Sequence, residues 1–203
     1  STVVSLLSRF YDLDSGKITI DGKDISQATL HSLRSQMGIM LQDSFIFSGT
    51  IYDNIRYGRL DATEEEIREA AKIVCADEFI SEMKDGYMTE VNERGSKLSG
   101  GQKQRLSIAR ALSRKPEILV FDDSFSALDY KTDAKLREGL NEKLKDTTKI
   151  IVAQRISTIR HADKIIVLDR GEAVGMGTHE ELMKNCDVYK EIALSQLSAA
   201  ELA

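Results

Sequence analysis

The sequence is poor in the residues that mark several classes of protein. Its 203 residues include only two cysteines, one proline and no tryptophan. The two cysteines, Cys75 and Cys186, are far apart in sequence and form neither a disulfide framework nor a metal-binding cluster, so a reducing compartment fits best. Hydrophobic residues make up 41% of the chain, an ordinary share that predicts a globular protein rather than a disordered one.

The chain also lacks long apolar runs and an excess of basic residues. No run approaches the roughly 20 apolar residues that a membrane-spanning helix needs, and the first residues lack the basic-then-apolar order of a signal peptide. Lys and Arg number 28 against 33 Asp and Glu, which gives a formal net charge of -5. Nucleic-acid binding usually needs a basic face, so we expect no nucleic-acid partner.

Short apolar runs alternate with helical patterns along the chain. Strands are expected at Met37 to Leu41, Ile118 to Phe121 and Lys149 to Ala153, and helices at Thr63 to Cys75 and Ser99 to Ser113. This alternation predicts one α/β domain with a mainly parallel core sheet. Other expected elements are a first helix ending near Tyr11, a strand at Lys17 to Gly22, helices at Glu78 to Met83 and Ala134 to Leu144, a hairpin of Ile165 to Leu168 with Glu172 to Val174, a capped helix after Thr178 and a last helix from about Val188.

Four short segments carry the candidate chemistry, and the first is Leu98-Ser99-Gly100-Gly101-Gln102 at the start of a helix. Glycines at a helix N-terminus let backbone N–H groups approach an anion closely, and the helix dipole favours negative charge there. The Ser99 hydroxyl can donate a further hydrogen bond. The segment therefore predicts a phosphate site, and the alternative is a glycine-rich loop that binds nothing.

The second segment is an acidic pair at the end of an apolar strand. Asp122 and Asp123 directly follow Ile118 to Phe121, and open α/β sheets bind ligands at the carboxyl ends of their strands. An aspartate in this position can hold Mg²⁺ through water, because Mg²⁺ takes few carboxylates and keeps its waters. The alternative is a strand that ends at a solvated acidic turn.

The third and fourth segments are Ser126-Ala127-Leu128-Asp129 and Gln42, the latter directly after an expected strand. In this order the four segments resemble the nucleotide-binding domain of the ATP-binding cassette (ABC) family, and the resemblance covers nearly the whole chain. It implies a P-loop NTPase (RecA-like) fold over residues 1–203, with a mainly parallel core sheet and a helical signature subdomain at about 43–115.

The resemblance implies ATP and Mg²⁺ as ligands and assigns roles by motif. Asp122 would be the Walker B aspartate and Gln42 the Q-loop glutamine, while residues 126–129 would form the D-loop. Ser1 and Thr2 look like the end of a Walker A motif. The Mg²⁺ ligands would then be Ser1, Gln42 and Asp122, and Thr2 would contact the α-phosphate of ATP.

Most of the phosphate loop is not in this sequence. The glycines and the lysine of G-x-x-x-x-G-K-[ST] are absent, as is the strand that precedes them in the family. We therefore expect an N-terminally truncated domain that, by itself, binds ATP weakly or not at all and has no ATPase activity. Loss of a central strand would expose apolar surface, so low stability or self-association is also expected.

Two further segments resemble ABC exporters in particular. The stretch from Phe45 to Ile55 is similar to the region that lies under the transmembrane domain, and Glu93-Arg94-Gly95 is similar to the exporter X-loop. The resemblance implies a transmembrane partner and a location on the cytoplasmic face of the membrane. The alternatives are an apolar segment that packs within its own domain, or a non-transport cassette of DNA repair or translation.

Two positions depart from the family's usual pattern. Asp123 replaces the glutamate that serves as base or positioner for the attacking water, and Gln154 replaces the histidine that contacts the γ-phosphate. Both are assigned as catalytic positions, and both changes weaken hydrolysis more than binding. The intact signature, Leu98 to Gln102, would serve the ATP of a second cassette. The chain thus resembles the degenerate-site half of a heterodimeric exporter, or alternatively a regulatory half that hardly hydrolyses ATP.

Overall fold

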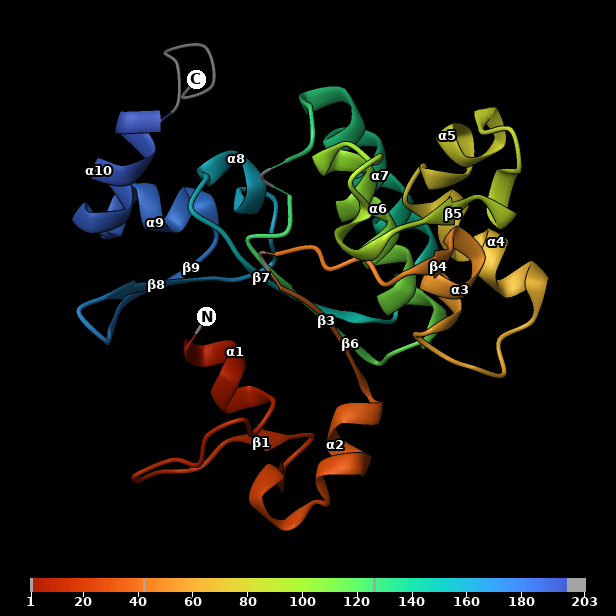
Figure 1. The fold of residues 1–203 in the computed structure, drawn as a ribbon. Coiled ribbons are helices and arrows are strands. Elements are labelled where there is room, and N and C mark those ends of the chain that lie inside the picture. Colours follow the sequence, from red (N-terminus) through yellow and green to blue (C-terminus); the bar gives the residue numbers. More distant parts are fainter. Residues whose placement is uncertain (1, 42, 126, 197–203) are drawn as a thin grey trace. The chain divides into compact units, whose positions relative to one another are not determined.

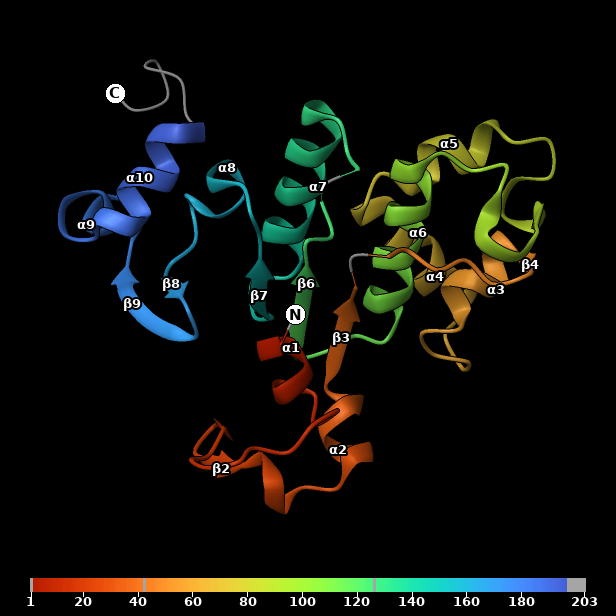
Figure 2. The same ribbon diagram turned by 60° about the vertical axis from the view of Figure 1, so that its left-hand side comes forward.

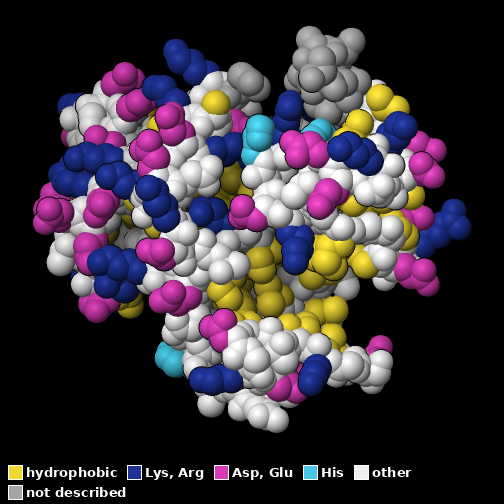
Figure 3. Space-filling view, turned by 180° about the vertical axis from the view of Figure 1, so that it is seen from behind, with side chains coloured by type: hydrophobic (Ala, Val, Ile, Leu, Met, Phe, Trp, Pro, Cys, Tyr) yellow, Lys and Arg dark blue, Asp and Glu magenta, His cyan; other side chains and the backbone are white. Residues whose placement is uncertain are grey.

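The computed structural model describes residues 2–41, 43–125 and 127–196 (Figure 1). The chain divides into two compact units, Ser1–Val152 and Ala153–Ala203. No helix within these described ranges is long and apolar enough to cross a membrane. Opposite charges are interspersed over the face shown in Figure 3, on which a group of hydrophobic side chains is also uncovered.

A three-stranded parallel sheet forms the centre of the first unit, in the order β3 (Met37–Met40), β6 (Ile118–Asp122), β7 (Thr148–Val152). Met40 pairs with Phe121, and Phe121 pairs with Ile151. The three strands run in the same direction in Figure 2. The prediction of a mainly parallel sheet is confirmed, and the carboxyl ends of all three strands lie at one edge.

The two faces of the sheet bury different partners because side chains alternate along a strand. Leu119 and Phe121 belong to the core that includes the helices α4 to α7. Ile118 and Val120 belong to a second core on the opposite face, which Val4 of α1 (Thr2–Leu7) joins. All five residues of β6 are buried, as expected for a central parallel strand.

Most helices on the first face start at well-defined side-chain caps. Thr50, Thr63 and Ser99 each form a capping box, in which the cap side chain and the third helical residue satisfy each other's backbone N–H groups. These helices surround a core of fully buried aliphatic side chains. They are α3 (Ile51–Arg56), α4 (Glu64–Ile73), α5 (Ala76–Glu82) and α6 (Gly100–Ser113), with the short elements β4 (Gly49–Thr50), η2 (Gly86–Met88), β5 (Glu90–Val91) and η3 (Glu93–Gly95).

The first expected helix is shorter than the apolar pattern suggested. It ends at Leu7 because Arg9 has a left-handed backbone, with φ of 51°. The expected strand at 17–22 is a tight hairpin of β1 (Thr19–Ile20) and β2 (Lys23–Asp24), whose turn residues Asp21 and Gly22 both have positive φ. The connection to β3 contains η1 (Ile25–Gln27) and α2 (Leu30–Ser35).

Helix α7 (Tyr130–Lys143) begins four residues before the expected start at Ala134. Asp129 caps it by accepting a hydrogen bond from the Thr132 N–H at 3.0 Å, a signal that the apolar pattern does not carry. The second unit contains the expected hairpin, the expected helix after Thr178 and the expected last helix. Its elements are α8 (Ile156–Ile159), β8 (Ile165–Asp169), β9 (Glu172–Gly177), α9 (His179–Asn185) and α10 (Asp187–Gln196).

Candidate functional site

The acidic pair lies at the carboxyl edge of the central sheet. Asp122 is the last residue of β6 and is only 5% exposed. Asp123 is half-buried and has a left-handed backbone with φ of 51°. That conformation is several-fold enriched in aspartate and asparagine among non-glycine residues. The turn therefore suits the short acidic side chain that the sequence places there.

The turn after β6 is tied to both neighbouring strands. The Asp123 N–H donates to the Val152 carbonyl at the end of β7, at 2.9 Å. On the other side, the buried Ser124 hydroxyl donates to the Met40 carbonyl at the end of β3, also at 2.9 Å. These bonds hold the ends of three strands together. Ser124 was not singled out from sequence, although a hydroxyl residue beside two aspartates at a strand end is a readable signal.

Three of the predicted site residues, Ser1, Gln42 and Ser126, lie outside the described residues. In the sequence, Gln42 follows Met40 by two positions. Thr2 is the exposed first residue of α1, and Val4 of the same helix packs in one core with Val120 of β6. The predicted Walker A remnant therefore begins a helix that covers one face of the central sheet.

The Leu98–Gln102 segment forms the start of α6. The Ser99 hydroxyl accepts the Gln102 N–H at 3.2 Å, and the Gln102 side-chain oxygen accepts the Ser99 N–H at 2.9 Å. Ser99 and Gly100 are exposed, whereas Leu98 is buried as an anchor. The glycine backbone at this helix N-terminus therefore faces solvent, as an anion site requires.

The structure brings this segment against the predicted D-loop. A Cβ atom at Gly101 would lie 3.3 Å from the Ala127 carbonyl oxygen, and one at Gly100 would lie 3.6 Å from Ala127 Cβ. Leu128 is buried beside them. The backbone N–H of Thr132 lowers the pKa of Asp129, which caps α7. Ser126 lies outside the described residues.

Gln154 belongs to the second unit, where its backbone is held by the side chain of Gln196 in α10. The Gln196 amide donates to the Gln154 carbonyl at 2.9 Å, and its oxygen accepts the Ile156 N–H at 2.9 Å. One amide side chain therefore fixes the strand-to-helix connection that carries Gln154. No local sequence pattern identifies Gln196, because it is forty residues away from Ile156.

Phe45, Phe47 and Tyr57 form an exposed cluster, called here the aromatic surface. Their exposed fractions are 46%, 40% and 52%. The Phe47 ring centroid lies 5.0 Å from that of Phe45 and 4.9 Å from that of Tyr57. The expected alternative, an apolar segment packed within its own domain, holds only in part: Ile51 and Ile55 are fully buried, but the three aromatic rings remain accessible.

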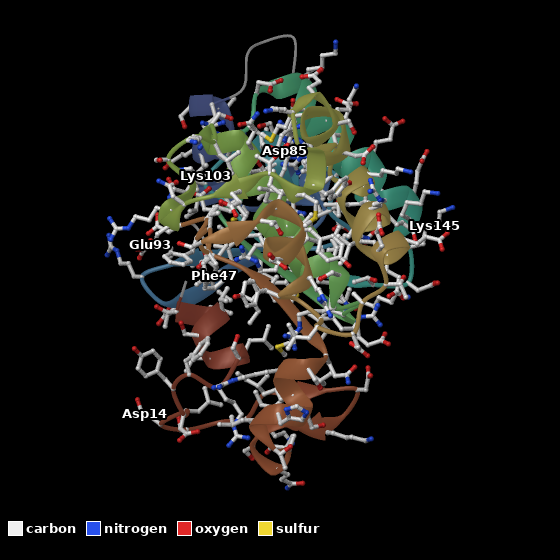
Figure 4. All side chains as sticks on the ribbon, turned by 45° about the vertical axis from the view of Figure 1, so that its right-hand side comes forward. Asp14, Phe47, Asp85, Glu93, Lys103 and Lys145 are labelled. Atoms are coloured by element: carbon white, nitrogen blue, oxygen red, sulfur yellow. The ribbon has the colours of Figure 1, made fainter. Side chains whose placement is uncertain are left out.

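The residues likened to the X-loop contact this same region. The Arg94 N–H donates to the Ile46 carbonyl at 3.0 Å. A Cβ atom at Gly95 would lie 3.3 Å from Ile46 side-chain atoms. Figure 4 shows Phe47, Glu93 and Lys103 on the same side of the first unit. The tertiary structure thus joins the 45–55 segment, the 93–95 segment and the signature helix.

The donor groups at the sheet edge suit a magnesium ion that arrives with a nucleotide. No three His, Cys, Asp or Glu side chains among residues 2–41, 43–125 and 127–196 form a group that could hold a metal ion by themselves. Mg²⁺ usually takes one or two carboxylates and fills its other positions with water and phosphate oxygens. Buried Asp122 fits that donor set.

Comparison with known proteins agrees with this arrangement. The model of the family described as ABC transporter matches residues 1–126. An uncharacterised ABC transporter ATP-binding protein, YknV of Bacillus subtilis, is 48% identical over 98% of this chain and 33% of its own length. A putative multidrug export ATP-binding/permease protein, YgaD of the same organism, is 51% identical over 95% of this chain and 33% of its own.

A solved structure of a bacterial Atm1-family ABC exporter with ATP bound has a TM-score of 0.94 and 44% sequence identity, and the match covers 97% of this chain and 35% of that one. The chain therefore spans about a third of the length of the relatives that it matches. The α/β fold with its parallel sheet is the P-loop NTPase fold of that structure. Together with the sheet-edge aspartates and the signature helix, these matches show that the chain belongs to the ABC transporter family.

Proposed function

We propose that this chain is the nucleotide-binding domain of an ABC exporter, in which binding and hydrolysis of MgATP between two cassettes drive transport across the membrane. The observation that carries the proposal is the sheet edge. A buried aspartate, Asp122, ends β6 directly before a turn that is bonded to the ends of both neighbouring strands, on a chain that matches the ABC transporter family model. The similar proteins named as exporters support the direction of transport.

The proposed roles of the residues follow from their positions. Asp122 would hold Mg²⁺ through water with Ser1 and Gln42, and Thr2 would bind the α-phosphate. Mg²⁺ would neutralise charge on the phosphates during transfer to water. Leu98 to Gln102 would present backbone N–H groups at the start of α6 to the nucleotide of the second cassette, with the D-loop, residues 126–129, beside them. Residues 43–115 would form the helical subdomain that carries this surface.

We further propose that the chain's own ATP site is degenerate. Asp123 carries the carboxylate one methylene closer to the backbone than glutamate would, and displacements of about 1 Å in a catalytic group can reduce the rate about 10²-fold. Its left-handed backbone favours aspartate over glutamate. Gln154 can donate a hydrogen bond but cannot become a cation near neutral pH. The partner would then be a different half-transporter that supplies the efficient site.

The aromatic surface is the proposed contact with the transmembrane domain, at the cytoplasmic face of the membrane. Three neighbouring rings with 40% to 52% exposure form a contiguous apolar patch, and contiguous exposed apolar patches can mark interaction sites. Aromatic residues also dominate the energy of protein interfaces.

The test is hydrolysis at this site in the whole exporter after the partner's own site has been inactivated. Asp123→Glu should raise the remaining turnover, by up to about 10²-fold if carboxylate placement is the limiting defect, and Gln154→His should raise it further. Asp133→Glu, the same substitution in the first turn of α7, is the matched control and should change nothing. Equal turnover at the two sites of the unmodified exporter would contradict the degenerate site.

A regulatory half that holds ATP with little hydrolysis is the second candidate, and the same two residues favour it. The two candidates differ in what the exporter does after the partner's site alone is inactivated. Transport that continues indicates hydrolysis at this chain's site, whereas loss of transport favours the regulatory half. Residues 1–203 by themselves would bind MgATP poorly and lack ATPase activity. Micromolar binding in calorimetry with this chain alone would contradict that part.

A further inference from the structure

Arg110 lies in α6, ten residues after Gly100, and reaches back to the segment below the aromatic surface. Its Nε donates to the Asn54 carbonyl at 2.8 Å, its Nη1 to the Phe45 carbonyl at 2.9 Å and its Nη2 to Asn54 Oδ1 at 2.8 Å. Its guanidinium carbon lies 4.7 Å from the Phe47 ring centroid. One side chain of the signature helix therefore binds three residues of the 45–55 segment.

Asn54 completes this connection from the other side. It is fully buried. Its Oδ1 also accepts the Phe47 N–H at 2.9 Å, and its Nδ2 donates to the Phe47 and Thr50 carbonyls at 2.9 and 3.0 Å. Asn54 thus fixes the backbone of Phe47, the central ring of the aromatic surface, while Arg110 fixes Asn54.

At this link the charged guanidinium of Arg110 is partly removed from water. Burial lowers the pKa of Arg110 to about 10. Among the described residues, the ion pairs involve other arginines and two lysines. The groups that solvate Arg110 are carbonyl and amide oxygens with an aromatic face. Even partial burial of a cation held in this way is costly. The planar fork of arginine meets several acceptors that a lysine ammonium, a point charge on a flexible stem, does not meet together.

Two more contacts fasten the same segment to the C-terminal half of α6. The Ser113 hydroxyl donates to the Ile55 carbonyl at 2.9 Å. Gly58 approaches α6 so closely that a Cβ atom would lie 1.9 Å from the Arg110 carbonyl oxygen. The other end of α6 is capped by Ser99 of the signature segment. At a rise of about 1.5 Å per residue, its 14 residues span about 21 Å.

We propose that Arg110 and Asn54 are positioning residues that make the aromatic surface and the signature end of α6 move as one body. This inference rests on the proposed function, in which the surface contacts the transmembrane domain and Ser99 to Gln102 contact the partner's nucleotide. Movement of the transmembrane domain at Phe47 is then delivered along α6 to the nucleotide. Because coupling between two sites is reciprocal, nucleotide bound at the signature end must also change the hydrogen exchange of the aromatic surface.

The experiment measures that reciprocal effect by hydrogen exchange in the whole exporter, with its partner half and transmembrane domain. Peptides that cover residues 45–58 are followed with and without MgATP and orthovanadate, and ATP affinity is measured on the same samples. In the unmodified protein the nucleotide should change the exchange of this segment. Arg110→Lys should reduce that nucleotide-dependent change at least about fivefold, the lower end of typical allosteric couplings, and ATP affinity should shift by no more than about the same factor because coupling is reciprocal.

A matched control separates coupling from folding. Arg34 makes a similar clamp elsewhere in the first unit: it donates to the Ser8 and Arg9 carbonyls at 3.0 and 2.8 Å, and its guanidinium lies 4.6 Å from the Phe10 ring centroid. Arg34→Lys should leave the nucleotide-dependent change at residues 45–58 intact. Exchange without nucleotide reports any general loosening of the fold in either variant.

A second variant keeps the link while it weakens the fold. Asn54→Asp retains the oxygen that receives Arg110 and removes the two amide donor bonds. It should lower stability yet keep most of the nucleotide-dependent change. The inference is overturned if Arg110→Lys keeps that change, if Arg34→Lys loses it equally, or if the unmodified exporter binds ATP without any effect at residues 45–58. Failure of the unmodified exporter to bind ATP would instead contradict the proposed function.

Discussion

Gly58 is the position where the structure makes the sharpest stability prediction. It follows α3 and Tyr57, and its φ is not in the left-handed region. Alanine therefore suits its backbone, and the whole effect of Gly58→Ala is steric. The added Cβ would lie 1.9 Å from the Arg110 carbonyl oxygen and 2.2 Å from Ser113 Oγ. Carbon–oxygen contacts are normally about 3.3 Å or longer, so the turn and α6 must separate by more than 1 Å.

That separation has a cost that can be worked out from the contacts. The Arg110 carbonyl belongs to the helix backbone and cannot rotate away. Moving the turn would stretch the Ser113 hydroxyl bond to Ile55 and the Arg59 Nε bond to the Ser113 carbonyl, now 2.9 and 3.1 Å. Overpacking costs about 1–3 kcal/mol and each hydrogen bond about 0.5–1.5 kcal/mol. We expect Gly58→Ala to lower the free energy of unfolding by roughly 2–6 kcal/mol.

Urea unfolding followed by far-UV circular dichroism measures this effect, since the chain has no tryptophan. Gly22→Ala is the matched control, because Gly22 has φ of 76° but no atom within 4 Å of its Cβ position. Its cost is conformational only, about 1–2 kcal/mol. The reasoning fails if Gly58→Ala is no more destabilising than Gly22→Ala. It also fails if adding Ser113→Ala restores the stability that Gly58→Ala loses. The closer collision of the added Cβ is with the Arg110 carbonyl oxygen, which Ser113→Ala does not remove.

Two further predictions concern the sheet edge and the second unit. Ser124→Ala should cost about 1–2 kcal/mol in urea unfolding, because it removes the buried hydroxyl bond to Met40. The control Ser35→Ala removes an exposed local bond and should cost under about 0.5 kcal/mol. Equal effects of the two substitutions would contradict a stabilising Ser124–Met40 bond. Burial, with a smaller effect of Arg160, lowers the pKa of His179 below 6.5. The unfolded chain then binds the proton more readily, so this contribution to stability is present above about pH 6.5 and is lost as the pH falls through the folded-state pKa. Urea unfolding between pH 7.5 and 5 should show a smaller loss for His179→Gln than for the unmodified chain, and identical curves would exclude the effect.

Much of the fold could be predicted from sequence because its signals are local. Apolar runs marked β3, β6 and β7, and cap residues such as Thr63 and Ser99 marked helix starts within one residue. The short elements were missed, since α2, α3 and α8 have at most six residues each and carry too few apolar positions to show a period. The early start of α7 was missed because an N-cap aspartate, not the hydrophobic pattern, sets it.

In the candidate site, the motif residues could be predicted from sequence but the residues that support them could not. Motif order singled out Asp122, Asp123 and the segment Leu98 to Gln102 as candidates, because those residue types meet chemical needs that a short segment can display. The supporting residues were not identified. Arg110 and Gln196 act through partners 56 and 40 or more positions away, and nothing in their own surroundings in sequence marks them.

The sequence by itself determined the residue types and their order: an apolar strand ending in two aspartates, a glycine pair at a helix start, and a run of aromatic residues after the first long strand. Those features depend on local chemistry, so they can be read from a linear chain. The tertiary structure decided which segments meet. It placed Gly100 and Gly101 against Ala127, tied the turn after β6 to Met40 and Val152, and fastened the aromatic surface to α6 through Arg110 and Asn54. Such contacts form only when distant segments pack around a shared core, because their hydrogen bonds and close approaches require a three-dimensional neighbour rather than a sequence neighbour.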